Sequence, residues 1–156
     1  MGLNPWRLGV LPNSPLGPLS VVVENDMITR LEWAALSGPT DPVGEEAVAQ
    51  LVAYFAGDLD QFDLPLAPLT TPFQQVFSEA LCDIPKGQTR TYGDLAKALG
   101  VSAQAIGQAC GANPIPIIVP CHRVLAQCGL GGYSGAGGIE AKVTLLRHES
   151  AASLLI

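Results

Sequence analysis

The first half of the chain carries the pattern of a β-hairpin followed by a helix. Two apolar runs, residues 19–23 and 27–33, flank the turn-forming tripeptide at residues 24–26 and predict two antiparallel strands. A loop rich in glycine and proline follows at residues 37–44. From residue 45 to residue 55 apolar side chains recur at helical spacing, so this segment predicts a helix.

The second half is separated from the first by a segment that contains two prolines. Residues 64–71 include Pro65 and Pro68, which disfavour both a helix and a central strand. We therefore interpret these residues as a linker. It divides the chain into an N-terminal structural domain with its linker, residues 1–71, and a C-terminal domain, residues 72–156.

Three hydroxyl residues in the second half mark the starts of helices. Thr71, Thr91 and Ser102 each precede an amphipathic segment, and each can accept a hydrogen bond from the first helical turn. The last two helices are joined by a turn that contains Gly100. They form a helix-turn-helix, whose second helix could enter a groove of DNA, although ordinary packing of two short helices is the alternative. The predicted helices cover residues 72–83, 92–99 and 103–112.

Prolines and glycines punctuate the remainder of the chain. Two prolines within residues 113–116 end the third helix, and residues 117–119 predict a short buried strand or extended run. Six glycines make residues 127–138 a loop, and a final helix is expected over residues 140–149. The expected fold is α/β of the α+β type: a small N-terminal β-hairpin or sheet-plus-helix domain, packed on a mostly helical C-terminal domain that contains the helix-turn-helix.

Composition agrees with a folded, water-exposed protein. Of the 156 residues, 48% are apolar and 14% are charged, which argues against disorder. No apolar run reaches the roughly 18 residues that span a bilayer. The N-terminus lacks the basic start and apolar core of a signal peptide. We therefore expect a cytoplasmic protein that makes no contact with a membrane.

Charge is divided unevenly between the two halves. The net charge is −6, but residues 1–71 carry nine acidic and two basic residues, a net −7, whereas residues 72–156 carry five acidic and six basic residues, a net +1. Contact with phosphates would therefore belong to the second half, and its weak positive charge predicts modest affinity for DNA.

The cysteines and histidines exclude one class of site and suggest another. None of the four cysteines forms a CxxC pair, and the chain has only two histidines, so a closed zinc site is poorly supported and we expect neither a metal nor a cofactor. Cys121 follows an apolar run and precedes His122 and Arg123. Both neighbours can lower the pKa of a thiol, and the thiolate is its nucleophilic form. Standing alone, a Cys-His pair is more often structural.

The residues around Cys121 favour a functional over a structural interpretation of this Cys-His pair. Residues 113–124, NPIPIIVPCHRV, resemble nearly residue for residue the active-site signature of the O6-alkylguanine-DNA alkyltransferase family, the methylated-DNA–protein-cysteine methyltransferases. Three further blocks resemble the same family in matching order and spacing: residues 84–96, 132–135 and 145–149. The resemblance implies a single-turnover DNA repair enzyme, which transfers a methyl or other alkyl group from O6-alkylguanine in DNA to its own Cys121.

The resemblance also implies catalytic roles. Cys121 would attack the alkyl carbon, and His122 would take the thiol proton through a bridging water. Glu149 would orient His122 and favour its cationic form. Tyr92 would donate a proton to the departing guanine, and Asn113 would tie the DNA-binding helix to the active-site loop by side-chain hydrogen bonds. Surface exposure of Glu149, core packing of Tyr92 and a helix-end position of Asn113 are the structural alternatives.

A second group of residues is implied to bind the substrate. Tyr133 and Pro116 would wall the base pocket, and the Ser134 region would hydrogen-bond the guanine O6. Val124 and Arg123 belong to the same group, although Arg123 could instead have a structural role, pairing with backbone near the site. Cys110 and Cys128 are expected to be small fillers or bystanders, although Cys128 could be reactive if it is exposed.

The partner implied is double-stranded DNA that contains alkylated guanine, bound by a monomer. The base must be rotated out of the duplex. Relatives do this with an arginine on the second helix of the helix-turn-helix, where this chain has Gln104. The predicted DNA contacts are Gln104, Ser102, Ala103 and Arg90, with Lys86 and Lys97 supplying further positive charge. Because the helix at 103–112 lacks any lysine or arginine, we expect weaker binding or slower base rotation than in a typical relative.

Three other functions remain open at this point. The first is a non-catalytic alkyltransferase-like protein that binds the lesion without repairing it. Such proteins lack the cysteine that is present here at position 121, whereas Gln104 favours this alternative. The second is a helix-turn-helix regulator. The third is a Cys-His hydrolase, for which no oxyanion-hole signature is evident.

Overall fold

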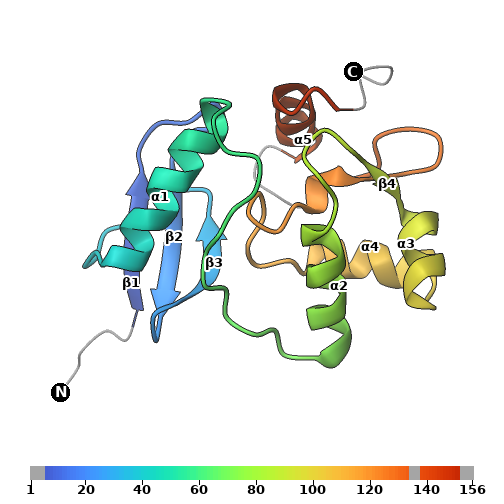
Figure 1. Ribbon diagram of the computed structural model, residues 1–156, viewed down its shortest axis with the longest axis horizontal. Helices are drawn as coiled ribbons and strands as arrows, with labels where there is room; N and C mark the ends of the chain where they lie inside the picture. The colour runs from blue at the N-terminus through green and yellow to red at the C-terminus, as the bar shows by residue number, and fades with distance from the viewer. Residues whose placement is uncertain (1–5, 134–137, 152–156) are drawn as a thin grey trace. The chain divides into compact units, whose positions relative to one another are not determined.

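A computed structural model of the chain describes residues 6–133 and 138–151 and divides into two compact units, Met1–Ala67 and Pro68–Ile156 (Figure 1). The first unit combines an antiparallel sheet with one helix, and the second is mainly helical with a short parallel strand pair. The expected mixed α/β class is confirmed. Among the described residues, no helix combines the length and the apolar character needed to cross a membrane.

The first unit is a three-stranded sheet of order β1-β2-β3, covered by helix α1 (Figure 1). The predicted hairpin is confirmed as β2 (Leu19–Glu24) and β3 (Met27–Glu32). Asn25 and Asp26 between them both have positive φ, +53° and +62°, as a two-residue hairpin turn of the type I′ kind requires. Central strand β2 is almost completely buried, as its run of apolar residues predicts.

Two features of this unit were missed from the sequence. Strand β1 (Trp6–Leu11) pairs antiparallel with β2, in the register Leu8 opposite Val22, although the proline-rich start of the chain obscured it. Helix α1 (Pro42–Phe55) begins three residues earlier than predicted, because the Asp41 side chain accepts a hydrogen bond from the Gly44 N–H at 2.8 Å. The helix also has a proline in its first turn. The N–H that proline lacks would have had no partner within the helix, so no helical hydrogen bond is lost.

Helix α1 lies so close to β1 that only glycine fits at the crossing. A Cβ atom on Gly44 would lie 2.6 Å from backbone atoms of Leu8 and Gly9, and one on Gly9 would lie 2.0 Å from the Gly44 carbonyl oxygen. Since the obstacles are backbone atoms rather than flexible side-chain ends, no rotamer change can relieve the clash.

The second unit confirms the three predicted helix starts. Helices α2 (Pro72–Cys82), α3 (Tyr92–Leu99) and α4 (Ala103–Gly111) are each preceded by a residue whose hydroxyl accepts a backbone N–H of the first turn. Gly100 ends α3 in the left-handed region, with φ of +70°. Helices α3 and α4 pack against each other as the expected helix-turn-helix. The three capping residues are Thr71, Thr91 and Ser102.

The chain between α4 and the last helix differs from prediction. Residues 117–119 are buried, but they form tight turns rather than a strand, and Ile117 has a φ of +72°. Prolines at 114, 116 and 120 supply no N–H donors for a ladder, and the Ile118 N–H instead donates to the Pro116 carbonyl at 2.9 Å. Helix α5 (Gly138–His148) begins two residues earlier than predicted and ends one residue earlier.

A short parallel pair holds the centre of the second unit. Strand β4 (Arg90–Thr91) leads into α3, and it pairs with β5 (Val124–Leu125), which follows a single 3₁₀ turn, η1 (Cys121–Arg123). The pairing therefore connects the start of the helix-turn-helix to the turn that carries Cys121. Around it lies an apolar core that includes Phe77, Leu81, Ile106, Leu145 and Leu146.

The Gly44 contact generates a prediction. Gly44→Ala should lower the free energy of unfolding by about 3 kcal/mol, because overpacking against backbone costs at least this order. Urea denaturation measures the change. Gly107→Ala is the matched control, since a Cβ there meets nothing within 4 Å and alanine is favoured over glycine inside a helix by about 0.5–1 kcal/mol. Equal free energies of unfolding for the two variants would contradict the close approach of α1 to β1 at Gly44.

Candidate active site

The turn η1 presents three consecutive polar residues inside the protein. Cys121, His122 and Arg123 are all buried. The turn forms because the Arg123 N–H donates to the Pro120 carbonyl at 3.0 Å and the Cys121 N–H donates to the Val119 carbonyl at 2.8 Å. Buried polar side chains need partners within the protein, and these determine what the site can do.

Glu149, just after α5, binds two of the three side chains. Its Oε1 accepts from Arg123 Nε at 2.9 Å, and its Oε2 accepts from Arg123 Nη2 at 2.9 Å. His122 Nε2 lies 2.8 Å from the same Oε2. The third guanidinium nitrogen of Arg123, Nη1, donates to the Ile84 carbonyl at 2.7 Å. Arg123, expected in the substrate site, thus has the structural position that the sequence had left as its alternative.

These contacts determine which nitrogen of His122 carries a proton. A carboxylate that accepts from a guanidinium at both oxygens has no proton of its own to offer, so Nε2 of His122 must be the donor toward it. In the neutral ring, Nδ1 is then an acceptor. Within the described residues this buried Nδ1 has no hydrogen-bond partner, so its lone pair is available to receive a proton.

Burial lowers the pKa of His122, although Glu149 acts to raise it. We expected Glu149 to favour the imidazolium form, and that effect is present, but the loss of hydration outweighs it. The resting imidazole is therefore neutral. A neutral ring with a free Nδ1 lone pair can act as a general base.

Burial also raises the pKa of the Cys121 thiol. The expected lowering by His122 and Arg123 is wrong, because both side chains are turned toward Glu149. The groups that lower this pKa are the Asn113 side chain, by a hydrogen bond, and the charge of Lys142. The sulfur rests as a thiol, so it must lose a proton before it can attack as a nucleophile.

Asn113 connects the end of α4 to the turn that carries the thiol. Its Nδ2 donates to the Val119 carbonyl at 2.9 Å, and its Oδ1 accepts from the Ile115 N–H at 3.0 Å. The same side chain hydrogen-bonds Cys121. One amide group thus joins the second helix of the helix-turn-helix, the proline-rich loop and the sulfur.

Lys142 is a site residue that the sequence prediction missed. It is fully buried on α5, and its Nζ donates to the carbonyls of Val124 at 2.7 Å and Gly132 at 3.0 Å. Burial lowers the pKa of Lys142 to about 8. Its position, three and four residues before Leu145 and Leu146, places it on the buried face of the helix, and this spacing was the available signal.

A cavity of about 250 Å³ opens beside Cys121. Tyr92 and Tyr133 line it. Pro116 and Val124, expected to bind the substrate, are buried, and they are not among the described residues that line the cavity. Ser134 falls outside the described residues. Burial raises the pKa of both tyrosines, which keeps their hydroxyls protonated and able to donate. The remaining lining residues are Gly107, Cys110, Gly111 and Gly132.

Gly131 allows the loop to reach Tyr92. Its φ is +72°, and a Cβ atom there would lie 2.9 Å from a ring carbon of Tyr92. Lys142 Nζ lies 6.0 Å from the centroid of the same ring, at the edge of the range for a cation–π contact. Glycine is therefore required here by both conformation and space.

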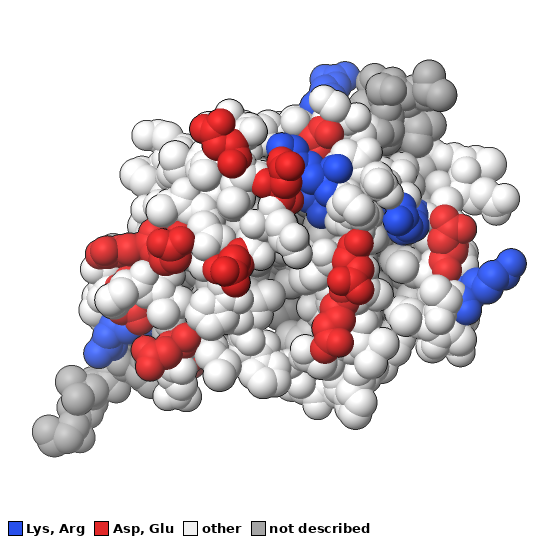
Figure 2. Space-filling model, in the orientation of Figure 1, with Lys and Arg blue, Asp and Glu red and all other residues white. Residues whose placement is uncertain are grey.

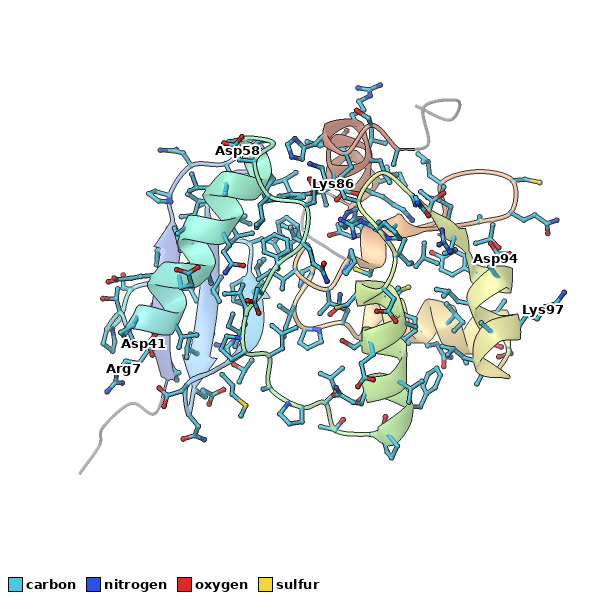
Figure 3. All side chains as sticks on the ribbon, viewed as in Figure 1. Arg7, Asp41, Asp58, Lys86, Asp94 and Lys97 are labelled. Carbon is cyan, nitrogen blue, oxygen red and sulfur yellow. The ribbon has the colours of Figure 1, made fainter. Side chains whose placement is uncertain are left out.

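The residues predicted to contact DNA lie at the beginnings of α3 and α4. Gln104 and Ala103 are exposed in the first turn of α4, while the Ser102 hydroxyl caps that helix. Arg90 on β4 is half-buried and donates to the Thr89 carbonyl at 2.9 Å. Lys97 projects outward from α3 (Figure 3). Figure 2 shows that acidic side chains dominate the visible face of the first unit.

Comparisons with known proteins agree on one family. Residues 72–151 match the family described as 6-O-methylguanine DNA methyltransferase, DNA binding domain, and residues 9–68 match the ribonuclease-like domain of the same methyltransferase. The chain is 43% identical to the methylated-DNA–protein-cysteine methyltransferase of Mycobacterium leprae, with 88% of each chain covered. It is 42% identical to the constitutive enzyme of Bacillus subtilis, with 87% of this chain and 91% of the relative covered.

Solved structures give the same result. The O6-methylguanine methyltransferase of Mycobacterium tuberculosis superposes with a TM-score of 0.80 at 40% identity, and the alignment covers 93% of each chain. The M. tuberculosis protein called OGT, solved in complex with DNA, superposes with a TM-score of 0.77 at 43% identity over 92% of each chain.

The buried lysine generates a pH prediction. The folded-state pKa of Lys142 is lowered from 10.5 to about 8, so between these values the unfolded chain binds more protons than the folded protein. Lys142 should therefore add to the free energy of unfolding a contribution that rises with pH across that window, whereas the thiols of Cys110 and Cys121, whose pKa is raised by burial, act in the opposite direction. Lys142→Met should lack this rise in urea denaturation at a series of pH values. The exposed Lys97→Met, as control, should retain it. If the free energies of unfolding of native protein and Lys142→Met differed by the same amount at every pH in the window, the lowered pKa of Lys142 would be wrong.

Proposed function

The chain belongs to the 6-O-methylguanine DNA methyltransferase family, and on that premise we propose that Cys121 is the sulfur that receives the alkyl group from O6-alkylguanine in double-stranded DNA. The protein is a DNA repair enzyme that transfers the group to its own cysteine, and its partner is DNA. The observation that carries the assignment to Cys121 is its position at the cavity, directly beside the buried His122–Glu149 pair.

The reaction begins with removal of the thiol proton. His122 accepts it at Nδ1 through a bridging water, and Glu149 stabilises the resulting imidazolium by its hydrogen bond to Nε2. Asn113 and Lys142 stabilise the thiolate, since both lower the pKa of Cys121. Glu149 and Arg123 hold the ring of His122 in place.

Alkyl transfer then proceeds by in-line displacement. The sulfur forms a bond to the alkyl carbon as the bond from that carbon to guanine O6 breaks, and the electron pair of the broken bond stays with the guanine. Tyr92, whose pKa is raised by burial, donates a proton to the departing base. The product is a thioether, which none of these groups can hydrolyse, so each molecule acts once.

Helix α4 brings the duplex to the cavity. Gly107 and Gly111 of this helix line the cavity, and Gln104 in its first turn takes the space of the base that rotates out. Gln104 can hydrogen-bond the orphaned base but lacks a positive charge. We propose that the protein acts as a monomer, since all the groups invoked belong to one unit of one chain.

Intact-mass measurement tests the assignment. After incubation with duplex DNA that contains O6-methylguanine, the native protein should gain the mass of one methyl group, and peptide mapping should locate it on Cys121. Cys121→Ser should gain nothing, while Cys128→Ser, which alters an exposed cysteine, should react like native protein. Tight binding of lesion DNA without an adduct would instead establish the lesion-binding alternative. Transfer that persists in Cys121→Ser would refute the role of this sulfur.

Gln104 generates a separate prediction. Gln104→Arg should raise the single-turnover rate on duplex DNA severalfold, because arginine adds both a planar hydrogen-bonding group and a charge where the base leaves. Gln108→Arg, exposed on the same helix, adds the charge alone and should have the smaller effect. Equal rates for the two variants would mean that charge, rather than the position of residue 104, limits the reaction.

A further inference from the structure

Two of the four cysteines lie at the same cavity. Cys110, in the last turn of α4, and Cys121, in the turn η1, both line it. Cys82 and Cys128 are not among the described residues of the lining. The proposed alkyl transfer uses one sulfur only, so the second thiol at the cavity has no part in it.

Asn113 holds the two cysteines near each other. Its backbone N–H donates to the Cys110 carbonyl at 3.3 Å, and its side chain hydrogen-bonds Cys121. Each thiol also lies within range of the charge on the other's surroundings: burial lowers the pKa of Lys142, whereas negative charge on Cys110 or on Cys121 acts to raise it. Because Coulomb interactions weaken with distance, both sulfurs lie near the same ammonium group.

The last turn of α4 has room to adjust. A disulfide requires its two Cα atoms to lie about 4.4–6.8 Å apart. A Cβ atom built at Gly107 or Gly111, on either side of Cys110, would meet no other atom within 4 Å, so the helix is not wedged at these positions. The carbonyls of a last turn also lack partners within the helix, which makes this turn easier to shift than the helix centre.

We propose that Cys110 is a resolving cysteine for Cys121: a peroxide that enters the cavity oxidises Cys121, and Cys110 then forms a disulfide with it that a thiol reductant can reverse. The disulfide stores the reactive sulfur in an inactive form and protects it from irreversible oxidation. The consequence for repair rests on the proposed function, whereas formation of the disulfide does not.

Two steps convert two thiols and one hydrogen peroxide into a disulfide and two waters. First, Cys121 loses its proton to His122 and attacks one peroxide oxygen. The O–O bond breaks, the leaving hydroxide takes the proton from His122, and Cys121 becomes a sulfenic acid. The sulfur of Cys110 then attacks the sulfur of Cys121, the S–O bond breaks, and the leaving hydroxide takes the thiol proton of Cys110. Peroxide is reduced, and both sulfurs are oxidised.

The surroundings of the two thiols determine which reacts first. Burial raises the pKa of Cys110 to about 12, and negative charge on Cys121 contributes to the rise, so Cys110 remains a neutral thiol while Cys121 is attacked. Once Cys121 is a neutral sulfenic acid, that charge is gone, and the positive charge of Lys142 still lowers the pKa of Cys110. Cys110 is therefore more easily ionised in the second step than in the first.

The test oxidises DNA-free protein with excess hydrogen peroxide, removes the excess with catalase, and reduces half of each sample with dithiothreitol. The readouts are intact mass without reductant, peptide mapping of the linked cysteines, and methyl transfer before and after reduction. Cys110→Ser removes the proposed partner. Cys128→Ser, which removes an exposed cysteine, is the matched control. Transfer by each protein is compared with that of its own untreated sample, so any effect of the substitution on the cavity cancels.

Native protein and Cys128→Ser should lose the mass of two hydrogen atoms, yield a peptide that links Cys110 to Cys121, and regain nearly all transfer on reduction. Cys110→Ser should gain the mass of two oxygen atoms and regain less than about a tenth, because thiols do not reverse a sulfinic acid.

Absence of the linked peptide from oxidised native protein, or equal recovery by native protein and Cys110→Ser, would overturn the proposal. The peptide map needs no variant, so it decides even if Cys110→Ser does not fold. Failure of the proposed function has a different signature: the linked peptide forms, but untreated protein transfers no methyl group or oxidised protein transfers it unimpaired.

Discussion

A carboxylate buried at the end of α5 holds the reactive turn in its working geometry. Glu149 accepts hydrogen bonds from both Arg123 and His122, and Arg123 continues to the Ile84 carbonyl ahead of β4. These contacts join the C-terminal helix, the turn η1 and the approach to the helix-turn-helix. Leaving one member of such a buried charged cluster without its partner costs about 3–5 kcal/mol. Removal of any one member is therefore costly, and together the members fix the orientation of the His122 ring.

The same burial that makes this cluster strong also restrains the chemistry. It keeps Cys121 protonated and His122 neutral at rest. Three groups favour ionisation of the thiol: Nδ1 of His122, which has no hydrogen-bond partner among the described residues, the hydrogen bond from Asn113, and the ammonium group of Lys142. In the proposed reaction, the sulfur therefore gains its charge by proton transfer to a neighbour and is not permanently charged.

Glycine has opposite uses in the two units. At the crossing of β1 and α1, Gly9 and Gly44 are there because two backbones touch. Along α4, Gly107 and Gly111 border open space. At both positions glycine lowers helix stability without meeting a packing requirement. Helix α4 also contains no lysine or arginine, so it offers no positive charge to a phosphate backbone.

Much of the secondary structure of this protein could be predicted from its sequence, because it depends on interactions between residues close together in the chain. The hairpin turn at Asn25-Asp26 and the capped starts of α2, α3 and α4 depend on residues within one turn of each other. The contact between His122, next to Cys121, and Glu149 also agrees with the family signature, which specifies those residue types at those spacings. Errors arose where local cues conflicted: prolines beside β1 obscured an edge strand, and prolines on both sides of Ile117 broke an apolar run into turns.

Tertiary structure alone decided the electrostatics of the site. Sequence neighbours suggested that His122 and Arg123 lower the pKa of Cys121, but the fold turns both toward Glu149, 27 and 26 residues away along the chain. Lys142 and Asn113 take that role instead. A pKa depends on burial and on charges close in space, and neither can be counted along the chain. Which small residues border the cavity, Cys110 among them, likewise became known only when α4 and the turn η1 were brought together.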